Sequence, residues 1–222
     1  MLVSLGVTLL LSFLAIKFSQ QVKSNQSSKL VLFIQTLVES LYEFVQSITP
    51  NQAAKFFPLI ATIFLFIVCA NWVGLLPGVE TIGILKQVSG EIKFVPLLRG
   101  GTADLNITLG LAIFAVISIQ FFGYQAKGMK YFKKFLDLTN PINFFVSLLE
   151  LISEIGRIIS FGFRLFGNIF AGEVLLAVIA LLIPVFAPLP FIGLEIFIGF
   201  IQALVFALLT LVFINIAVSE NH

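Results

Sequence analysis

The sequence predicts an all-α integral membrane protein with five membrane helices and one amphipathic helix at the membrane surface. Of its 222 residues, 59% are hydrophobic and only 11% are charged, whereas a soluble domain of this length carries roughly 25% charged residues. Apolar runs long enough to cross about 30 Å of hydrocarbon recur along the chain. The last two runs are unusually long, and we expect them to form a tilted helical hairpin.

Composition also argues against several functions. The net charge of +2 is too small to indicate nucleic-acid binding, and the basic residues cluster beside apolar segments. Cys69 is the only cysteine and His222 the only histidine. An internal disulfide is therefore impossible, and a single imidazole makes no metal site. We expect no cofactor, no metal and no nucleic-acid partner.

We expect one membrane domain over residues 1–222, built from five apolar segments. Their predicted bounds are 2–18, 56–76, 105–125, 142–183 and 190–218. The first three have ordinary spanning length. The fourth is about twice as long as a perpendicular crossing needs at 1.5 Å per residue, so it must tilt, bend or lie along a partner. The fifth is also long and follows a break that contains Pro184, Pro188 and Pro190.

The placement of lysines predicts the orientation. Clusters follow the first and third segments, and their members are Lys17, Lys23, Lys29, Lys127, Lys130, Lys133 and Lys134. Both clusters should be cytoplasmic, because positive charge is retained inside. The N-terminus and the 77–104 loop are then outside and the C-terminus inside. No transit segment precedes the first apolar run, so we expect a bacterial plasma membrane.

Residues 29–48 predict an amphipathic helix rather than a span. Apolar side chains recur at helical spacing, polar side chains that include Glu39 and Glu43 fall on the opposite side, and Pro50 ends the pattern. Such a helix lies on the cytoplasmic leaflet or against a partner there.

Ionisable side chains in the last two segments are the functional candidates. Between residues 141 and 219 they are Glu150, Glu154, Arg157, Arg164, Glu173 and Glu195. Each would cost roughly 2.5–3.5 kcal/mol at the bilayer centre, so each needs a partner or water. Glu150 and Glu154 could instead reach the interface from a helix end. Arg164 lies too far from either end of its segment to do so.

Helical geometry groups these side chains. At about 100° per residue, one arc of roughly 80° on the fourth segment holds Glu150, Glu154, Arg157, Arg164 and Asn168. Ser160 lies close to this arc, whereas Glu173 points about 180° away from Arg164. Glu195 and Gln202 share a face of the fifth segment. The stripe could hold the two helices together by hydrogen bonds, but its excess of acids favours a proton-accessible path.

Chain direction places acids on both sides of the arginine. Glu150 should lie toward the cytoplasm and Glu173 toward the exterior, roughly 21 Å and 13 Å of helix from Arg164. A pathway made of two half-channels requires acids that are approached from opposite sides and separated by a permanent cation.

Four segments resemble the a subunit family of F-type ATP synthases. The most specific is FRLFGNIFAGE at 163–173, and the others are IQALVF at 201–206, NWVGLLP at 71–77 and ADLNIT at 103–108. The resemblance covers about residues 56–219. It implies a stator beside a ring of c subunits, each with a membrane carboxylate, together with peripheral-stalk b subunits and the remaining F1Fo subunits.

The resemblance also implies roles for individual residues. Arg164 matches the essential arginine of the family. Positions linked to ion passage are matched by Asn168, Glu173 and Gln202, and positions of the cytoplasmic half-channel by Glu150 and Ser160. Glu195 stands where some members have histidine, and Gly74 replaces an acid found in some members. Arg157 matches a position that is basic in some members, and we expect it to be a packed or interfacial cation.

Alternatives to a proton-translocating stator remain at this stage. The chain lacks a G-x-x-x-x-G-K-[ST] motif, so we expect a non-catalytic subunit whose ATP chemistry belongs to others. The same subunit could carry sodium, since selectivity depends largely on the ring. A secondary transporter would use Arg164 to bind an anionic solute, and a structural scaffold would leave the central arginine unexplained.

Overall fold

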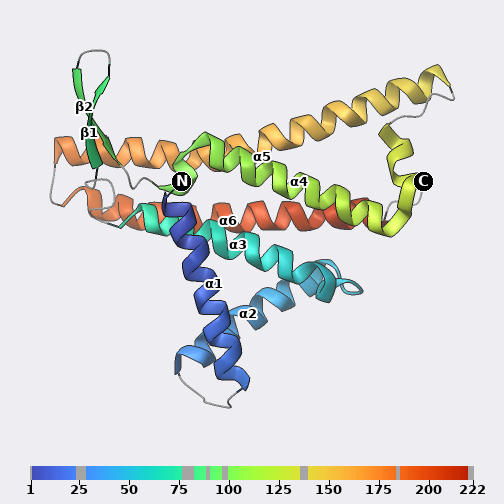
Figure 1. Ribbon diagram of the computed structural model, residues 1–222, viewed down its shortest axis with the longest axis horizontal. Coiled ribbons are helices and arrows are strands. Elements are labelled where there is room, and N and C mark those ends of the chain that lie inside the picture. Colours follow the sequence, from blue (N-terminus) through green and yellow to red (C-terminus); the bar gives the residue numbers. More distant parts are fainter. Residues whose placement is uncertain are drawn as a thin grey trace.

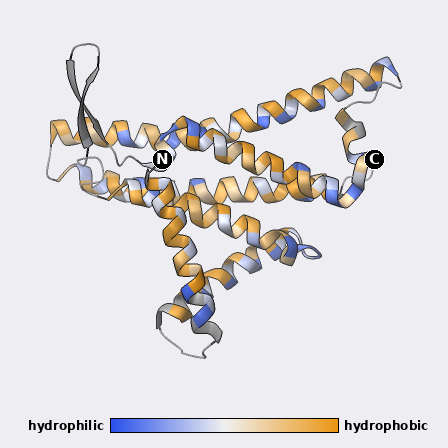
Figure 2. Ribbon diagram, in the orientation of Figure 1, coloured by the Kyte–Doolittle hydropathy of each residue, from blue (hydrophilic) through white to orange (hydrophobic). Residues whose placement is uncertain are grey.

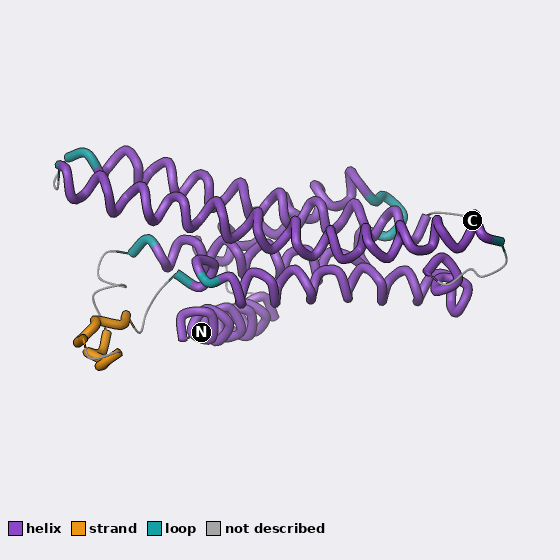
Figure 3. The backbone as a smooth tube through the Cα atoms, turned by 90° about the horizontal axis from the view of Figure 1, so that it is seen from above, coloured by secondary structure: helices purple, strands orange, loops and turns teal. Residues whose placement is uncertain are grey.

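The computed structural model describes residues 2–23, 29–76, 83–88, 91–96, 100–135, 140–183 and 186–219. The elements follow in this order: α1 (Leu2–Lys23), α2 (Lys29–Ile48), α3 (Ala53–Gly74), β1 (Gly83–Val88), β2 (Glu91–Pro96), η2 (Gly101–Ala103), α4 (Leu105–Lys127), η3 (Gly128–Phe135), α5 (Pro141–Leu182) and α6 (Pro188–Ser219). Helices α4, α5 and α6 lie along one long axis, and α1 leaves them steeply (Figure 1). Figure 3 shows α1 nearly end-on beside that bundle.

Four described helices are long and apolar enough to cross a membrane. They comprise Ala53–Gly74, Leu105–Phe132, Pro141–Leu182 and Pro188–Ser219. The apolar stretch of α1, Val3–Lys17, is shorter, so the predicted total of five membrane helices stays a prediction. Figure 2 shows that apolar residues dominate the long helices. The chain is a multi-pass helical membrane protein.

A β-hairpin departs from the predicted all-α class. Strands β1 and β2 pair antiparallel within the 77–104 loop, in a register that runs from Gly83 opposite Pro96 to Val88 opposite Glu91. Each strand pairs its backbone with the other, and the sequence between them is Ser-Gly, a pair typical of tight turns. Mixed charges and short length hid this local signal among the long apolar runs.

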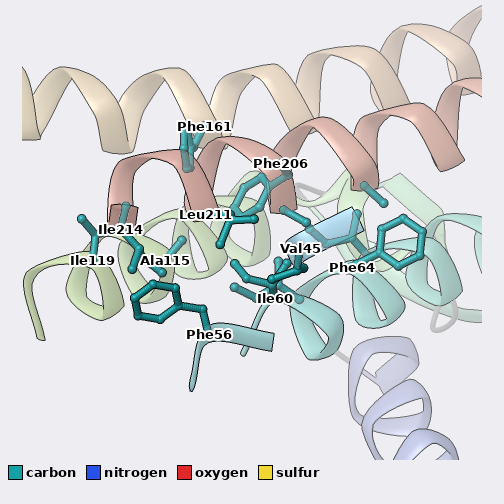
Figure 4. Close-up of a cluster of buried hydrophobic side chains, with 14 of the residues drawn as sticks. Val45, Phe56, Ile60, Phe64, Ala115, Ile119, Phe161, Phe206, Leu211 and Ile214 are labelled. Atoms are coloured by element: carbon teal, nitrogen blue, oxygen red, sulfur yellow. The ribbon is translucent and has the colours of Figure 1, made fainter. Parts of the chain in front are cut away.

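The apolar core lies where α3, α4 and α6 meet. Phe56 and Ile60 of α3 and Leu211 of α6 are buried there, with Ile119 of α4 beside them (Figure 4). Small buried side chains on α6 let its neighbours approach closely; they are Gly199, Ala203, Ala207 and Thr210. Helix α6 therefore contacts α3, α4 and α5 and is the central element of the fold.

Helix α5 is the least covered of the long helices. In its apolar stretch of 18 residues, 11% of the residues are buried, compared with 44% in the corresponding stretch of α3. It is 42 residues long, which at 1.5 Å per residue is about 63 Å, twice the hydrocarbon thickness. It runs antiparallel to α6 (Figure 1), as the predicted hairpin requires. One face of α5 is thus left to lipid or to a partner.

Replacement of Gly162 by alanine should loosen the contact between α4 and α5. An added Cβ at Gly162 would lie 2.6 Å from Leu109 Cδ2 and 3.3 Å from Leu109 Cα. We expect Gly162→Ala to lower the free energy of unfolding by about 1–3 kcal/mol, measured by denaturation of the purified chain in detergent.

Gly156→Ala is the matched control, since a Cβ there meets nothing within 4 Å. That change should be neutral or stabilising, because alanine favours the helix. Equal stability of the two variants would contradict the close approach of α4 to Gly162.

Candidate functional site

Arg164 lies on the uncovered face of α5. Its side chain is exposed, and its Nη2 donates a hydrogen bond of 3.1 Å to Oγ of Ser160, one turn earlier. Among the described residues, Arg164 forms no ion pair. The helix therefore presents a permanent cation outward, with a neutral hydroxyl as its hydrogen-bond acceptor.

A polar link joins α5 to α6 one turn beyond Arg164. Asn168 Nδ2 donates to Gln202 Oε1 at 2.7 Å. Gln202 is only 5% exposed, and its Nε2 has no hydrogen-bond partner within the described part of the chain. The sequence placed these residues on separate helices, and packing brings them together.

Two carboxylates meet at a small cavity between α5 and α6. Glu195 is 5% exposed and Glu173 is half-buried, and both line a cavity with room for about one water molecule. The rest of its lining is Asn71, Gly74, Leu75, Gly100, Thr102 and Ile169. The predicted shared face of Glu195 and Gln202 is buried on α6. The cavity offers two acids, a hydroxyl and an amide to a water or a proton.

Glycines let these carboxylates lie against the backbone. A Cβ at Gly172 would lie 2.6 Å from Glu195 Oε1, and one at Gly100 would lie 2.9 Å from Glu173 Oε1. Real Cβ atoms do not approach so closely, so each carboxylate depends on a missing side chain. Gly172 belongs to α5, Gly100 to the segment before η2, and Glu195 to α6, so three parts of the chain shape the site.

Asn71 connects the segments around Glu195 by two hydrogen bonds. Its Nδ2 donates to the carbonyl of Gly199 at 2.9 Å, and its Oδ1 accepts from Thr102 Oγ1 at 2.6 Å. Trp72 Nε1 donates to the carbonyl of Ile196 at 3.1 Å. Helix α3 and η2 are thereby tied to the first turns of α6. Sequence reasoning assigned no role to these residues; the match at 71–77 was the one signal near them.

The other ionisable groups of α5 lie nearer its N-terminal end. Both carboxylate oxygens of Glu154 accept hydrogen bonds from Arg157 Nη1, at 2.6 and 2.7 Å. The guanidinium carbon of Arg157 is 4.0 Å from the centroid of the Phe213 ring on α6. Arg157 is thus a packed cation, as expected. Glu150 is half-buried and lies about 21 Å of helix from Arg164.

The residues of the predicted stripe on α5 therefore lie in different environments. Glu154 is buried beside Arg157, whereas Ser160, Arg164 and Asn168 are exposed. The structure brings Arg164 to Ser160, Asn168 to Gln202, and Glu173 to the cavity of Glu195. Glu150 lies one turn before Glu154, toward the N-terminal end of α5. In the described part of the chain, no three His, Cys, Asp or Glu side chains lie together so that they could hold a metal ion.

The fold and site define a multi-pass membrane protein that keeps ionisable side chains between long apolar helices, an arrangement typical of ion pathways. The family model described as ATP synthase A chain matches residues 1–215, and the chain belongs to that family. It is therefore a subunit a of the membrane Fo sector of F-type ATP synthases, the sector that contains the c-ring, and it is not itself the catalytic subunit.

The Asn168–Gln202 contact should show as an energetic coupling. A double-mutant cycle of Asn168→Ala and Gln202→Ala should give about 0.6 kcal/mol, the average for hydrogen bonds between membrane helices. The free energy of unfolding in bicelles is the quantity to measure.

A cycle of Asn168→Ala with Thr210→Ala is the control, because Thr210 bonds the carbonyl of Phe206 in its own helix. Its coupling should be close to zero. Equal coupling energies in the two cycles would show that the Asn168–Gln202 hydrogen bond is not the cause of the coupling.

Proposed function

We propose that this chain is the proton-translocating stator of its ATP synthase, with two aqueous half-channels that open to the c-ring and are separated by Arg164. The observation that carries the proposal is the position of Arg164. It stands near the middle of a 42-residue apolar helix, on a face that the described chain leaves uncovered, without an ion pair among the described residues.

A cation in that position needs an anionic partner or water, and among the described residues it has no ion-pair partner. A charge inside the membrane is costly unless it is paired or hydrated. The c-ring supplies this partner in the proposal, as a carboxylate on each ring subunit. A guanidinium keeps its proton, so Arg164 favours the ionised ring carboxylate without joining a proton relay.

The outer half-channel leads from the cavity to the ring. Glu173 and Glu195 line that cavity, and the Asn168–Gln202 pair lies between it and Arg164 along the helices. Carboxyl groups exchange protons with water and amides hydrogen-bond to it, so this order supports delivery of a proton to the ring carboxylate. The resulting neutral carboxylic acid can then rotate into lipid.

The inner half-channel uses the opposite part of α5. Glu150 and Ser160 are its proposed groups, and Ser160 already bonds to the guanidinium. After nearly a full turn of the ring, a proton released near Ser160 would leave past Glu150. The fixed charge of Arg164 discourages direct flow between the two paths. Each proton that crosses about 100 mV supplies roughly 2.3 kcal/mol, so several are needed per ATP.

The surrounding assembly follows from the same proposal. In this proposal the N-terminus lies outside and the C-terminus inside a bacterial plasma membrane, and the lysine clusters support that orientation. Helix α2, with Glu39 and Glu43 on its exposed side, lies at the cytoplasmic leaflet, within reach of the peripheral-stalk b subunits. We favour protons over sodium because the candidate groups are simple acids, amides and hydroxyls.

Replacement of Arg164 by alanine should abolish ATP-driven acidification of inverted vesicles that contain the whole complex. Without the cation, the ring carboxylate is no longer held ionised at the stator and the two paths are no longer separated. Passive proton leak, recorded after removal of the catalytic head, should be retained or increased.

Phe163→Ala is the matched control, because it shortens an exposed neighbour and changes no charge. It should pump at close to the native rate. Normal pumping by assembled Arg164→Ala would sink the proposal. ATP-driven sodium uptake without acidification by the native complex would replace protons by sodium.

Replacement of Gly172 by alanine should slow pumping by displacing the Glu195 carboxylate. The new Cβ would collide with Glu195 Oε1, and Glu195→Asp, one methylene shorter, should partly restore the rate in the double variant. The measurement is the initial rate of ATP-driven acidification by Gly172→Ala and by the double variant.

Gly167→Ala is the control, since a Cβ there meets nothing within 4 Å. If Gly172→Ala pumped as fast as Gly167→Ala, the position of the Glu195 carboxylate would have no part in proton passage.

A further inference from the structure

The η3 corner, residues 127–135, is a lysine-rich turn at the C-terminal end of α4. Helix η3 begins at Gly128, where α4 ends (yellow-green in Figure 1), and its register includes Lys130, Lys133 and Lys134, with Lys127 as the last residue of α4. Residues 127–134 contain four lysines and no acid, and Asp137 follows three residues after Lys134. The segment from 127 to 137, with four lysines and one aspartate, therefore has a net charge of +3.

The register of η3 places two of its lysines and most of its apolar positions on different edges. A 3-10 helix has three residues per turn, so positions 130 and 133 lie one above the other, and positions 129, 132 and 135 form a second edge. Lys134 shares the third edge with Tyr131. On that second edge Met129 is 74% exposed and Phe132 is 46% exposed. Exposed apolar side chains beside lysines are typical of a segment at the boundary between hydrocarbon and headgroups.

Packing braces the corner against α4. Gly128 has a φ of 64°, which favours glycine, and its N–H donates to the carbonyl of Tyr124. Tyr131 is buried, and its hydroxyl donates to Gln120 Oε1 at 2.8 Å. A Cβ at Gly123 would lie 2.5 Å from the Tyr131 ring, so the ring sits directly on α4. The backbone of the turn is consequently braced against α4, which lowers the ordering cost of binding.

Aromatic contacts extend this support toward the exposed edge. The Phe132 ring lies 5.6 Å from that of Tyr124 and 6.5 Å from that of Phe135, measured between centroids. Lys130 is exposed, and within the described residues it forms no ion pair. Its ammonium is therefore available to an anion from outside the chain.

We propose that the η3 corner binds the headgroups of anionic phospholipids. The candidate span Leu105–Phe132 has Lys127 and Lys130 in its last turns, and lysines near the end of a membrane helix reach toward the headgroups. The phosphodiester of such a lipid accepts hydrogen bonds and carries the complementary charge, while its acyl chains cover Met129 and Phe132. Lysines beside an anionic surface strengthen attraction by roughly fivefold each. The proposal does not depend on the ion pathway.

The test uses the whole complex in vesicles of phosphatidylcholine with a minor fraction of phosphatidylglycerol. Either lipid carries a photoreactive group near its headgroup, and crosslinks to residues 124–135 are counted by mass spectrometry. Phosphatidylglycerol should crosslink preferentially. The triple variant Lys130→Gln, Lys133→Gln, Lys134→Gln should reduce that preference at least about tenfold.

Two further variants serve as controls. Arginine at the same three positions keeps the charge and should keep the preference, and Lys17→Gln, Lys86→Gln, Lys93→Gln removes equal charge elsewhere and should leave it unchanged. Inorganic phosphate should not compete when ionic strength is matched with chloride. Equal crosslinking by both lipids, no crosslinks from either, displacement by free phosphate, or an unchanged preference in the glutamine variant would overturn the proposal.

Discussion

The cost of an ionised side chain in hydrocarbon is the constraint on which the structure depends. Helix α5 contains two arginines in the long apolar hairpin, and each satisfies this constraint in a different way. Arg157 is satisfied inside the chain, by the Glu154 carboxylate and the Phe213 ring. Arg164, seven residues later, faces outward with a hydroxyl beside it. The contrast makes the uncovered face of α5 the place where a charged partner is needed.

Helix α6 makes the buried side of the site possible. Its small residues bring α3 and α5 close, and that proximity lets Asn71 reach the carbonyl of Gly199 and Asn168 reach Gln202. Close backbones also create the contacts of Gly172 and Gly100 with carboxylates. A packing rule of membrane helices thus positions the polar groups, because small side chains leave room for polar ones between the helices.

Depth in the bilayer separates the roles of the remaining charges. Lys130 stands just past the end of α4, where the proposed contact with headgroups would make a cation inexpensive, whereas Arg164 stands near mid-helix. The first kind of charge is suited to anchor a segment at the membrane surface. The second kind needs a counter-charge or water. Under the two proposals, one chain uses basic residues both to hold its position and to act on a moving partner.

Local pattern in the sequence determined the helices of this protein. Hydropathy located the long segments to within a few residues, the amphipathic period delimited residues 29–48, and helical spacing put Glu195 and Gln202 on one face. These features depend on neighbours a few residues apart. The shared cavity of Glu173 and Glu195, the Asn71 contacts and the packing of Arg157 on Phe213 join residues far apart in sequence. Only the tertiary structure decided them, because the rotation and separation of packed helices are set by side chains on both partners.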